Sequence, residues 1–199
     1  MHKLMNTFSA NSLKILEKSE KDFIDKYIAR LDFINKTNSA KTGEKLHGLI
    51  SYYLRGFDVD KIKNSLSGKE KELVEKAFSL EIFKEREKFI KIEETFLVKC
   101  GACSPVFYLT GRFDAIFKDG EKYTIYDWKS KNIPKNPAQD LQSIVYLYCA
   151  SKIFNTENLS IKYISLEDTK SCEAEFENAE KYLNKILKIV KKLPPKYLT

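Results

Sequence analysis

Apolar residues recur at helical spacing through the first 88 positions of the chain. This period predicts a first helix over residues 8–31, capped by Ser9 or Ser12, and a second helix over about 39–57. The charged stretch 58–88 predicts two shorter helices, broken near Ser67-Gly68. The expected buried stripes are Leu13, Leu16, Phe23, Tyr27 and Leu31 in the first helix, and Leu46, Leu49, Ile50, Tyr53 and Phe57 in the second.

From residue 89 onward, apolar and polar residues alternate at strand spacing. Residues 89–99 predict one strand, 108–129 a hairpin of two strands, and 157–168 a fourth. A turn over residues 100–105 precedes the hairpin, and a proline-containing loop after it leads into a helix over about 138–154. A final amphipathic helix is expected over 173–193. The order predicts an α/β fold, a central mixed sheet flanked by helices.

The hairpin segment 111–129, GRFDAIFKDGEKYTIYDWK, places charged side chains inside aromatic strands. A two-residue loop at Asp119-Gly120 would set Asp114 opposite Ile125 and Asp127 opposite Arg112. Asp114, Asp127 and Lys129 then share one face, and the two aspartates are diagonal neighbours with Cα atoms about 7–8 Å apart. The opposite face is expected to carry Phe113, Ala115, Phe117, Tyr126 and Trp128.

Composition and charge narrow the class of protein. With 199 residues, 43% hydrophobic, the chain is expected to form one domain. The net charge of +7 fits either a lysine-rich proteome or an anionic partner, nucleic acid first. Since no apolar run approaches about 18 residues and the N-terminus lacks a signal-peptide core, we expect no membrane span, a cytoplasmic protein and reduced cysteines.

The charged face of the hairpin suits phosphodiester hydrolysis. A divalent cation stabilises charge on the phosphate and activates water, and magnesium needs only one or two carboxylates. Asp114 and Asp127 meet that need, and Lys129 can orient the water or neutralise developing charge. A surface salt-bridge cluster is the alternative. His47 stands beside an apolar helix face, where histidine is usually structural. Gly43, one turn earlier, would let another element come close to it.

These residues resemble the PD-(D/E)XK nuclease superfamily, in particular its RecB-like exonuclease branch. That branch carries G-x-x-D on one strand, D-Y-K or D-W-K on the next and Q-x-x-x-Y on the following helix. The matching residues here are Gly111-x-x-Asp114, Asp127-Trp128-Lys129 and Gln142-x-x-x-Tyr146. An upstream G-x-x-x-H is matched by Gly43 and His47, and an S-x-x-S-L type helix by Ser9 to Leu13.

The resemblance implies a restriction-endonuclease-like core over residues 89–193, preceded by a mainly helical part, 1–88, that carries His47. Mg²⁺ or Mn²⁺ would be held by His47, Asp114, Asp127 and the carbonyl of Trp128. Lys129 would be the catalytic lysine, with Gln142 and Tyr146 positioning it, the water or the nucleic acid. The residues expected to contact nucleic acid are Arg112, Lys131, Lys135 and Tyr146. Glu93 or Glu94 matches an acidic position often found in the preceding strand.

An iron–sulfur cluster, which many relatives bind, is not expected. Those relatives use one cysteine before the core and three near the C-terminus, whereas this chain has Ser19-Glu20 at the first place and no C-terminal trio. Cys100-x-x-Cys103, with Cys149 and Cys172, is a poor substitute, and Cys149 is read as a small buried hydrophobe.

The predicted function is therefore a metal-dependent DNA nuclease, of the exonuclease type, acting in DNA repair, recombination or defence. Because relatives are often fused to a helicase and this chain has no P-loop, a helicase or another recombination or defence protein is an expected partner. Two alternatives remain open: a catalytically inactive nucleic-acid-binding module of a larger complex, and a structural metal-binding protein that uses the cysteines.

Overall fold

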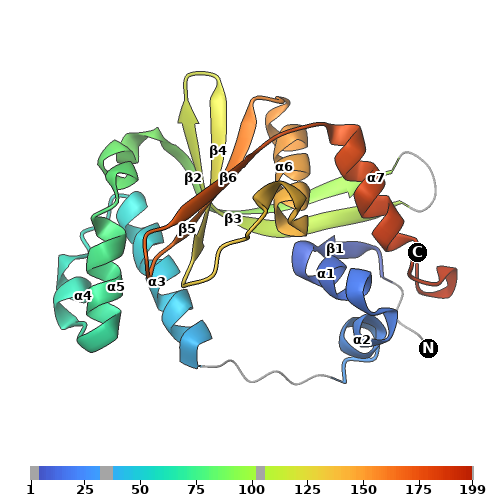
Figure 1. Cartoon of the computed structure of the whole chain (residues 1–199), viewed down its shortest axis with the longest axis horizontal. Coiled ribbons are helices and arrows are strands. Elements are labelled where there is room, and N and C mark those ends of the chain that lie inside the picture. The colour runs from blue at the N-terminus through green and yellow to red at the C-terminus, as the bar shows by residue number, and fades with distance from the viewer. Residues whose placement is uncertain (1–4, 32–37, 102–105, 199) are drawn as a thin grey trace.

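A mixed sheet lies between two groups of helices (Figure 1). The computed structural model describes residues 5–31, 38–101 and 106–198. Within them the sheet has six strands, in the order β1-β3-β4-β5-β6, with β2 paired to β3. The α/β prediction is thereby confirmed. The strands are β1 (Thr7–Ser9), β2 (Phe89–Cys100), β3 (Phe107–Asp119), β4 (Lys122–Lys129), β5 (Leu159–Ser165) and β6 (Ser171–Glu175).

The α-helices are α1 (Ala10–Lys18), α2 (Glu20–Phe23), α3 (Asn38–Leu54), α4 (Asp60–Ser65), α5 (Gly68–Phe78), α6 (Leu141–Phe154) and α7 (Ala179–Val190). In Figure 1, α1, α6 and α7 lie on one side of the sheet and α3, α4 and α5 on the other. Each group encloses its own apolar core. Phe8, Val145 and Ile186 belong to the first core, while Ile50, Val74 and Trp128 belong to the second.

Strand β3 is the longest strand and has different neighbours along its two edges. Strand β2 pairs antiparallel with it from Phe107 to Phe117. On the opposite edge, β1 pairs parallel with residues 108–110, and β4 pairs antiparallel with residues 115–119. Residues 111–114 lie between β1 and β4 and pair with neither strand. We call this stretch the strand gap; it contains Gly111 and Asp114.

The hairpin of β3 and β4 has a register that differs from the predicted one by two residues. Asp119 pairs with Lys122, so Gly120 and Glu121 form the loop. Gly120 has φ +55° at the first loop position, where a type II′ turn places glycine. Continued by one pair, this register sets Asp114 directly across from Asp127, not diagonal to it. A shift of two residues does not by itself move side chains to the other face.

Phe113 does not share a face with its expected neighbours. Ala115, Phe117, Tyr126 and Trp128 pack in the α3–α5 core as predicted, but Phe113 packs in the core beneath α6. The strands are irregular at this level, because Glu93 of β2 has a φ of +51° and no ladder pair with Asp114 is formed. The irregularity changes the side-chain alternation between Phe113 and Ala115.

The N-terminal part corrects the prediction of one helix over residues 8–31. Thr7–Ser9 is a strand, α1 ends at Lys18, and Ser19 is extended and caps α2, which runs into a π-helical turn over Ile24–Ile28. The side chain of Ser9 caps α1 reciprocally with Ser12, as a capping box. Two expected core residues are exposed, Leu31 by 68% and Phe57 by 59%, because each follows its helix.

The segment 58–88 contains the two predicted helices, α4 and α5, separated at Leu66-Ser67, and continues as a 3₁₀ helix over Glu81–Lys88. The helix expected over 138–154 begins as α6 at Leu141, after a 3₁₀ turn at Pro137–Gln139. The prediction of a helix over 173–193 is wrong in its first part. Ser171–Glu175 forms edge strand β6, and α7 begins only at Ala179.

Two predicted features lie outside the described residues: the connection over 32–37, and the part of the turn that contains Cys103. Among the helices that are described, none is long and apolar enough to cross a membrane.

Candidate active site

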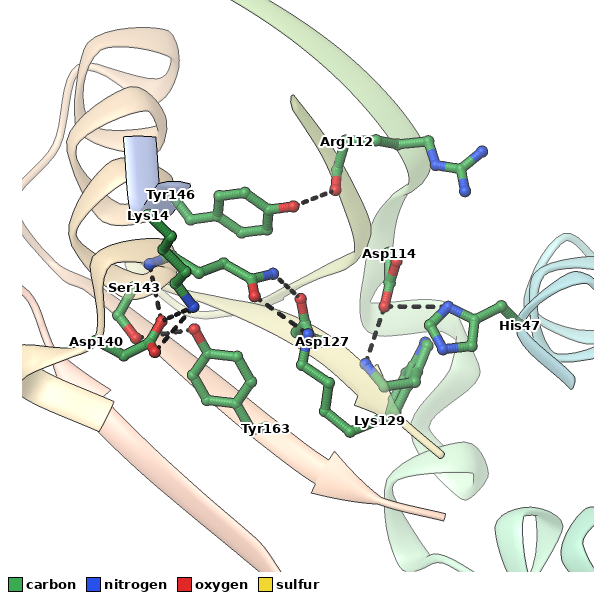
Figure 2. Close-up of polar contacts among 12 residues, drawn as sticks. Lys14, His47, Arg112, Asp114, Asp127, Lys129, Asp140, Ser143, Tyr146 and Tyr163 are labelled. Carbon is green, nitrogen blue, oxygen red and sulfur yellow. Dashed lines mark hydrogen bonds and ion pairs between the residues drawn. The ribbon is translucent and has the colours of Figure 1, made fainter. Parts of the chain in front are cut away.

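Three polar side chains meet where β4 passes the first turn of α6. The Lys129 ammonium lies 2.7 Å from Asp127 Oδ1 and donates a hydrogen bond of 3.1 Å to the Gln142 side-chain oxygen. The Gln142 side-chain nitrogen donates to Asp127 Oδ2 at 2.5 Å. Gln142 therefore bridges the carboxylate and the ammonium. As Figure 2 shows, Asp127 and Lys129 face α6 together.

Asp114 lies on the other side of this group, next to His47. Its Oδ2 accepts a hydrogen bond of 2.9 Å from the backbone N–H of Trp128 and lies 3.4 Å from His47 Nδ1 (Figure 2). The carboxylate thus takes the place of a ladder partner where the pairing of β3 with β4 ends. Residues from α3, β3 and β4 meet here, as the predicted site requires.

Gly43 explains how α3 reaches the strands. A methyl group at this position would lie 2.5 Å from the Ser130 hydroxyl, directly after β4. The bare glycine therefore lets the residue that follows β4 approach α3 one turn before His47.

Gly111 has a similar role in the strand gap. The Phe96 ring of β2 lies across it, so a methyl group at Gly111 would come within 2.5 Å of that ring. Phe96 stacks on Phe113, and the edges of both rings meet Tyr146. The Tyr146 hydroxyl donates to the carbonyl of Arg112 at 3.0 Å (Figure 2). The aromatic cluster therefore holds Tyr146 against the strand gap, where the backbone of β3 pairs with neither β1 nor β4.

The start of α6 is set by a residue that the motif search did not select. Asp140 caps the helix by accepting from the Gln142 N–H at 2.8 Å. Lys14 of α1 binds both Asp140 oxygens, at 3.1 and 3.0 Å. Ser143 and Tyr163 add a buried hydroxyl pair at 2.8 Å. An aspartate just before an apolar run is a cap signal that could have identified Asp140, whereas no sequence signal pairs it with Lys14.

Burial is the largest single influence on the pKa values of the ionisable side chains in the site. Burial raises the pKa of Asp127 to about 6; Lys129 opposes this shift and Asp114 adds to it. Burial alone would lower the pKa of His47, but its hydrogen bond to Asp114 and the negative charges of Asp114 and Asp127 raise it overall. Burial, and then the two carboxylates, raise the pKa of Tyr146, which therefore remains a neutral hydroxyl.

The carboxylates and His47 form two contacting groups in the described structure. Within the part of the chain that the structure describes, no three His, Cys, Asp or Glu side chains form a group that could hold a metal ion. His47 is directed at Asp114, whereas Asp127 is engaged by Lys129 and Gln142. Asp127 Oδ1 is nevertheless buried and accepts no well-aligned hydrogen bond.

Two hollows open beside the site. One, of about 530 Å³, lies between α3 and the strands, and His47, Glu93, Arg112 and Lys129 contribute to its lining. The other, of about 200 Å³, is lined by the start of α1 together with Thr110, Gly111, Gln142 and Tyr146. The strand gap lies between the two hollows.

Three of the residues predicted to contact nucleic acid, Arg112, Lys131 and Lys135, have exposed side chains. Arg112 is 55% exposed, with its guanidinium 3.7 Å from Glu93, which Arg55 also approaches at 3.7 Å. Lys131 and Lys135 are exposed on the loop after β4, and Lys131 lies 3.5 Å from Glu167. Glu94 is paired with Lys91 instead. Glu93, of the two candidate glutamates, is therefore the one that lines a hollow.

The cysteines that the structure describes are free thiols away from the site. Cys100 and Cys149 are buried and Cys172 is half-buried. The prediction that Cys149 packs as a small hydrophobe is confirmed, since it is fully buried in the α6 core.

Comparison with known proteins identifies the family. The family model of the PD-(D/E)XK nuclease superfamily matches residues 7–196, which is nearly the whole chain. This chain belongs to the PD-(D/E)XK nuclease superfamily. Its mixed six-strand sheet flanked by helices is consistent with the restriction-endonuclease-like fold of that superfamily. Membership implies a nuclease, a hydrolase of phosphodiester bonds, and such nucleases typically use divalent metals.

A solved structure shows the same fold. The protein described as "Crystal structure of SSO0001" is similar with a TM-score of 0.54 and 17% identity, over 97% of this chain and 79% of that one. At this identity the likeness concerns the fold alone. A search of curated proteins gave no match.

Proposed function

We propose that this PD-(D/E)XK protein is a metal-dependent deoxyribonuclease of the RecB-like branch, with exonuclease activity. The observation that carries the proposal is the bridge made by Gln142 between Asp127 and Lys129, beside Asp114 and within the strand gap. A surface salt-bridge cluster would not account for it, because the Asp127 side chain is only 5% exposed. Taking the Asp127 carboxylate out of water carries a desolvation cost that an exposed surface pair does not have.

The residues present fit a divalent cation in their chemistry. Two carboxylates, an imidazole and a backbone carbonyl form an oxygen-rich donor set suited to Mg²⁺ or Mn²⁺. Asp114, Asp127, His47 and the carbonyl of Trp128 would hold the cation. The raised pKa of the buried Asp127 marks negative charge that Lys129, 2.7 Å from Oδ1, offsets only in part and that a cation would compensate further. When bound, the metal supplies charge stabilisation at the phosphate and lowers the pKa of a water molecule.

The side chains of the chain have separate roles in this proposal. Lys129 places its ammonium at the reacting phosphate, where it neutralises developing charge or holds the attacking water. Gln142 fixes that ammonium, and its contact with Asp127 keeps the carboxylate oriented. Tyr146, a neutral hydroxyl at the strand gap, positions the strand of nucleic acid between the two hollows. His47 orients Asp114 through the contact of 3.4 Å.

DNA is the proposed substrate, and Arg112, Lys131 and Lys135 are its proposed contacts around the site. Arg112 lines the larger hollow, and the two lysines follow β4 on an exposed loop. Action at DNA ends would place the protein in repair, recombination or defence, beside a helicase or another protein that opens duplexes.

A cleavage assay tests the activity and its type. Wild-type protein is incubated with end-labelled linear DNA, single- and double-stranded, and with closed circular DNA, in Mn²⁺, Mg²⁺ or EDTA. We expect metal-dependent shortening of linear DNA from its ends and no cutting of the circle. Asp127→Asn should be inactive in every condition. Cutting of the circle would overturn the exonuclease proposal and leave the nuclease proposal standing.

A non-catalytic nucleic-acid-binding module is the second candidate. The observation that favours it is the absence, among described residues, of three metal-binding side chains grouped around one centre. It predicts that DNA binds equally well in EDTA and remains intact with either metal. The same assay decides between the two, since DNA left intact by wild-type protein would contradict the nuclease proposal.

A further inference from the structure

The positive charge of the chain is concentrated at its C-terminal end. Residues 181–199 contain six lysines and no acidic residue. The other 180 residues carry the remaining 29 basic and all 28 acidic side chains, so they are almost neutral together. The net charge of +7 is therefore largely a property of α7 and the segment after it, not an even excess of lysine over the whole protein.

Four of these lysines lie on one side of α7 and the turn that follows it. Lys181, Lys185, Lys188 and Lys192 follow each other at intervals of four, three and four residues, which is the spacing of one helix face. We call them the α7 lysine stripe. The other side of α7 is apolar and already buried, through Tyr182, Ile186, Ile189 and Val190. Because the apolar side packs in the protein core, it is not free to insert into a lipid surface.

The stripe differs from other lysine-rich surfaces in its partners. On α5 and the following 3₁₀ helix, lysines pair with neighbouring glutamates, as in Lys76–Glu72 and Lys84–Glu81, both at 2.8 Å. In the stripe, only Lys181 pairs with a carboxylate of the described residues, that of Glu177. Lys185 and Lys192 instead donate to the backbone carbonyls of Gln139 and Glu17, at 3.2 and 2.7 Å. The charge of the stripe is thus largely uncompensated.

These contacts also connect the stripe to the active site. The carbonyl of Gln139, which Lys185 contacts, is one residue from Asp140, the cap of α6. Lys14 of α1 binds Asp140 and lines the hollow of about 200 Å³ together with Gln142 and Tyr146. Lys18 follows Lys14 by one turn and is exposed. Lysine side chains therefore occur from the smaller hollow, past the start of α6, to α7, and these three helices α1, α6 and α7 are neighbours in Figure 1.

We propose that the α7 lysine stripe, continued by Lys14 and Lys18, binds the phosphodiester backbone of the nucleic acid strand beyond the reacting phosphate. This inference rests on the proposed function, and it assigns the strand a path through the smaller hollow. At 1.5 Å per residue, the 12 residues of α7 are about 18 Å long, so the stripe follows several nucleotides of an extended strand. A lysine makes a point-charge contact without reading the base, so the surface is independent of sequence.

The test compares two triple variants in EDTA, where no cleavage occurs. Lys185→Gln/Lys188→Gln/Lys192→Gln removes stripe charge, and Lys71→Gln/Lys76→Gln/Lys84→Gln removes the same charge from glutamate-paired lysines. Binding of labelled oligothymidylate is measured at two lengths, short enough for the site alone or long enough to reach the stripe, over a series of salt concentrations. Because each single-strand phosphate contact contributes about 0.7 to the slope of log K against log salt, the stripe variant should lose up to roughly 2 from that slope.

We expect the stripe variant to bind the long oligonucleotide about tenfold or more weakly near 0.1 M salt and the short one unchanged, while the control variant behaves as wild type. Equal behaviour of the two triple variants would overturn the inference. The single substitution Lys188→Glu is a check against loss of folding, because this exposed side chain makes no hydrogen bond or ion pair within the described residues. It should weaken long-strand binding as well. Stripe-dependent binding to vesicles of anionic phospholipid, without such binding to the oligonucleotide, would also overturn it.

The outcomes separate this inference from the proposed function. If wild-type protein cleaves DNA but the stripe substitutions change neither affinity nor salt slope, the nuclease proposal stands and the stripe proposal is wrong. If the stripe binds long strands but wild-type protein cleaves nothing with Mn²⁺ or Mg²⁺, the surface stands and the nuclease proposal is wrong.

Discussion

Gln142 touches both Asp127 and Lys129, so one amide group sets the distance between a proposed metal ligand and the proposed catalytic ammonium. The two charged groups also contact each other directly, at 2.7 Å. At the scale of single residues, the site therefore depends on a neutral side chain as well as on its charges. Asp140 and Lys14 support Gln142 through the start of α6.

Gln142→Ala should lower kcat on DNA by roughly 10- to 100-fold, because a mispositioned reacting group costs about that much. Substrate affinity should change much less. Steady-state kinetics, with Gln139→Ala as the matched control, measures the effect; the exposed Gln139 side chain lies in the turn just before α6. A kcat for Gln142→Ala equal to that of Gln139→Ala would contradict this role.

His47→Ala should weaken the binding of Mn²⁺. The imidazole is close enough to orient Asp114 and is itself a proposed ligand. Loss of either contribution typically reduces metal affinity about 10- to 100-fold. The measurement is the rise in Tm with added Mn²⁺, which reports binding without cleavage. Lys45→Ala, an exposed substitution on the same helix, should respond to Mn²⁺ like wild type. An unchanged Mn²⁺ response in His47→Ala would exclude His47 from the metal site.

The strand gap is the feature of the site that belongs to the scale of elements. Because β1 and β4 share one edge of β3 without meeting, residues 111–114 keep backbone groups free for Tyr146 and bring Asp114 to the end of the ladder. Gly111 is required there by the Phe96 ring that crosses it. The glycine of the G-x-x-D motif thus has a packing reason that is independent of chemistry.

Gly111→Ala should destabilise the protein by about 1–3 kcal/mol, the usual cost of overpacking a filled core. Chemical denaturation of the variant measures the free energy of unfolding. Gly48→Ala is the control, because no atom lies within 4 Å of the added methyl group and alanine favours a helix interior. Adding Phe96→Leu to Gly111→Ala should recover part of the loss, and a fully additive double variant would argue against the contact.

How far the sequence predicted these elements depended on the strength of each local signal. Alternation located β2, β3 and β4, and parity alone put Asp114, Asp127 and Lys129 on the same side. It could not choose between turn positions for Gly120, so the register was wrong by two residues. Strand β1 has three residues and β6 has five, both at the ends of the sheet order and too short for a period to stand out. Their pairing is a property of the folded sheet.

For the site too, local sequence signals predicted some residues, and others could be found only in the folded structure. Sequence motifs selected His47, Asp114, Asp127, Lys129, Gln142 and Tyr146, and the structure brings these residues together around the strand gap. The motifs could not find Lys14, which is 126 residues away from Asp140 in the chain. They also implied that His47 and both aspartates share one cation, which stays a prediction. In the described structure His47 contacts Asp114, and Asp127 contacts Lys129 and Gln142.

At the scale of the whole molecule, two apolar cores hold two helix groups on opposite faces of one sheet. The α3 group delivers His47, and the α6 group delivers Gln142 and Tyr146. The hollows lie on either side of the strand gap, and the uncompensated lysines of α7 lie beyond the smaller one. In the proposed function, nucleic acid would run along this line past the residues assigned to catalysis.

The most direct measurement of the central claim is the cleavage of end-labelled DNA with Mn²⁺ by wild-type protein, Lys129→Ala and Lys122→Ala. Both lysines lie on β4, but Lys122 pairs with Glu175 at 2.9 Å at the opposite end of the strand. We predict that Lys122→Ala cleaves like wild type and that Lys129→Ala loses activity by at least about 100-fold while keeping its Tm. Equal cleavage by the two variants, or intact DNA with wild-type protein, would contradict the account.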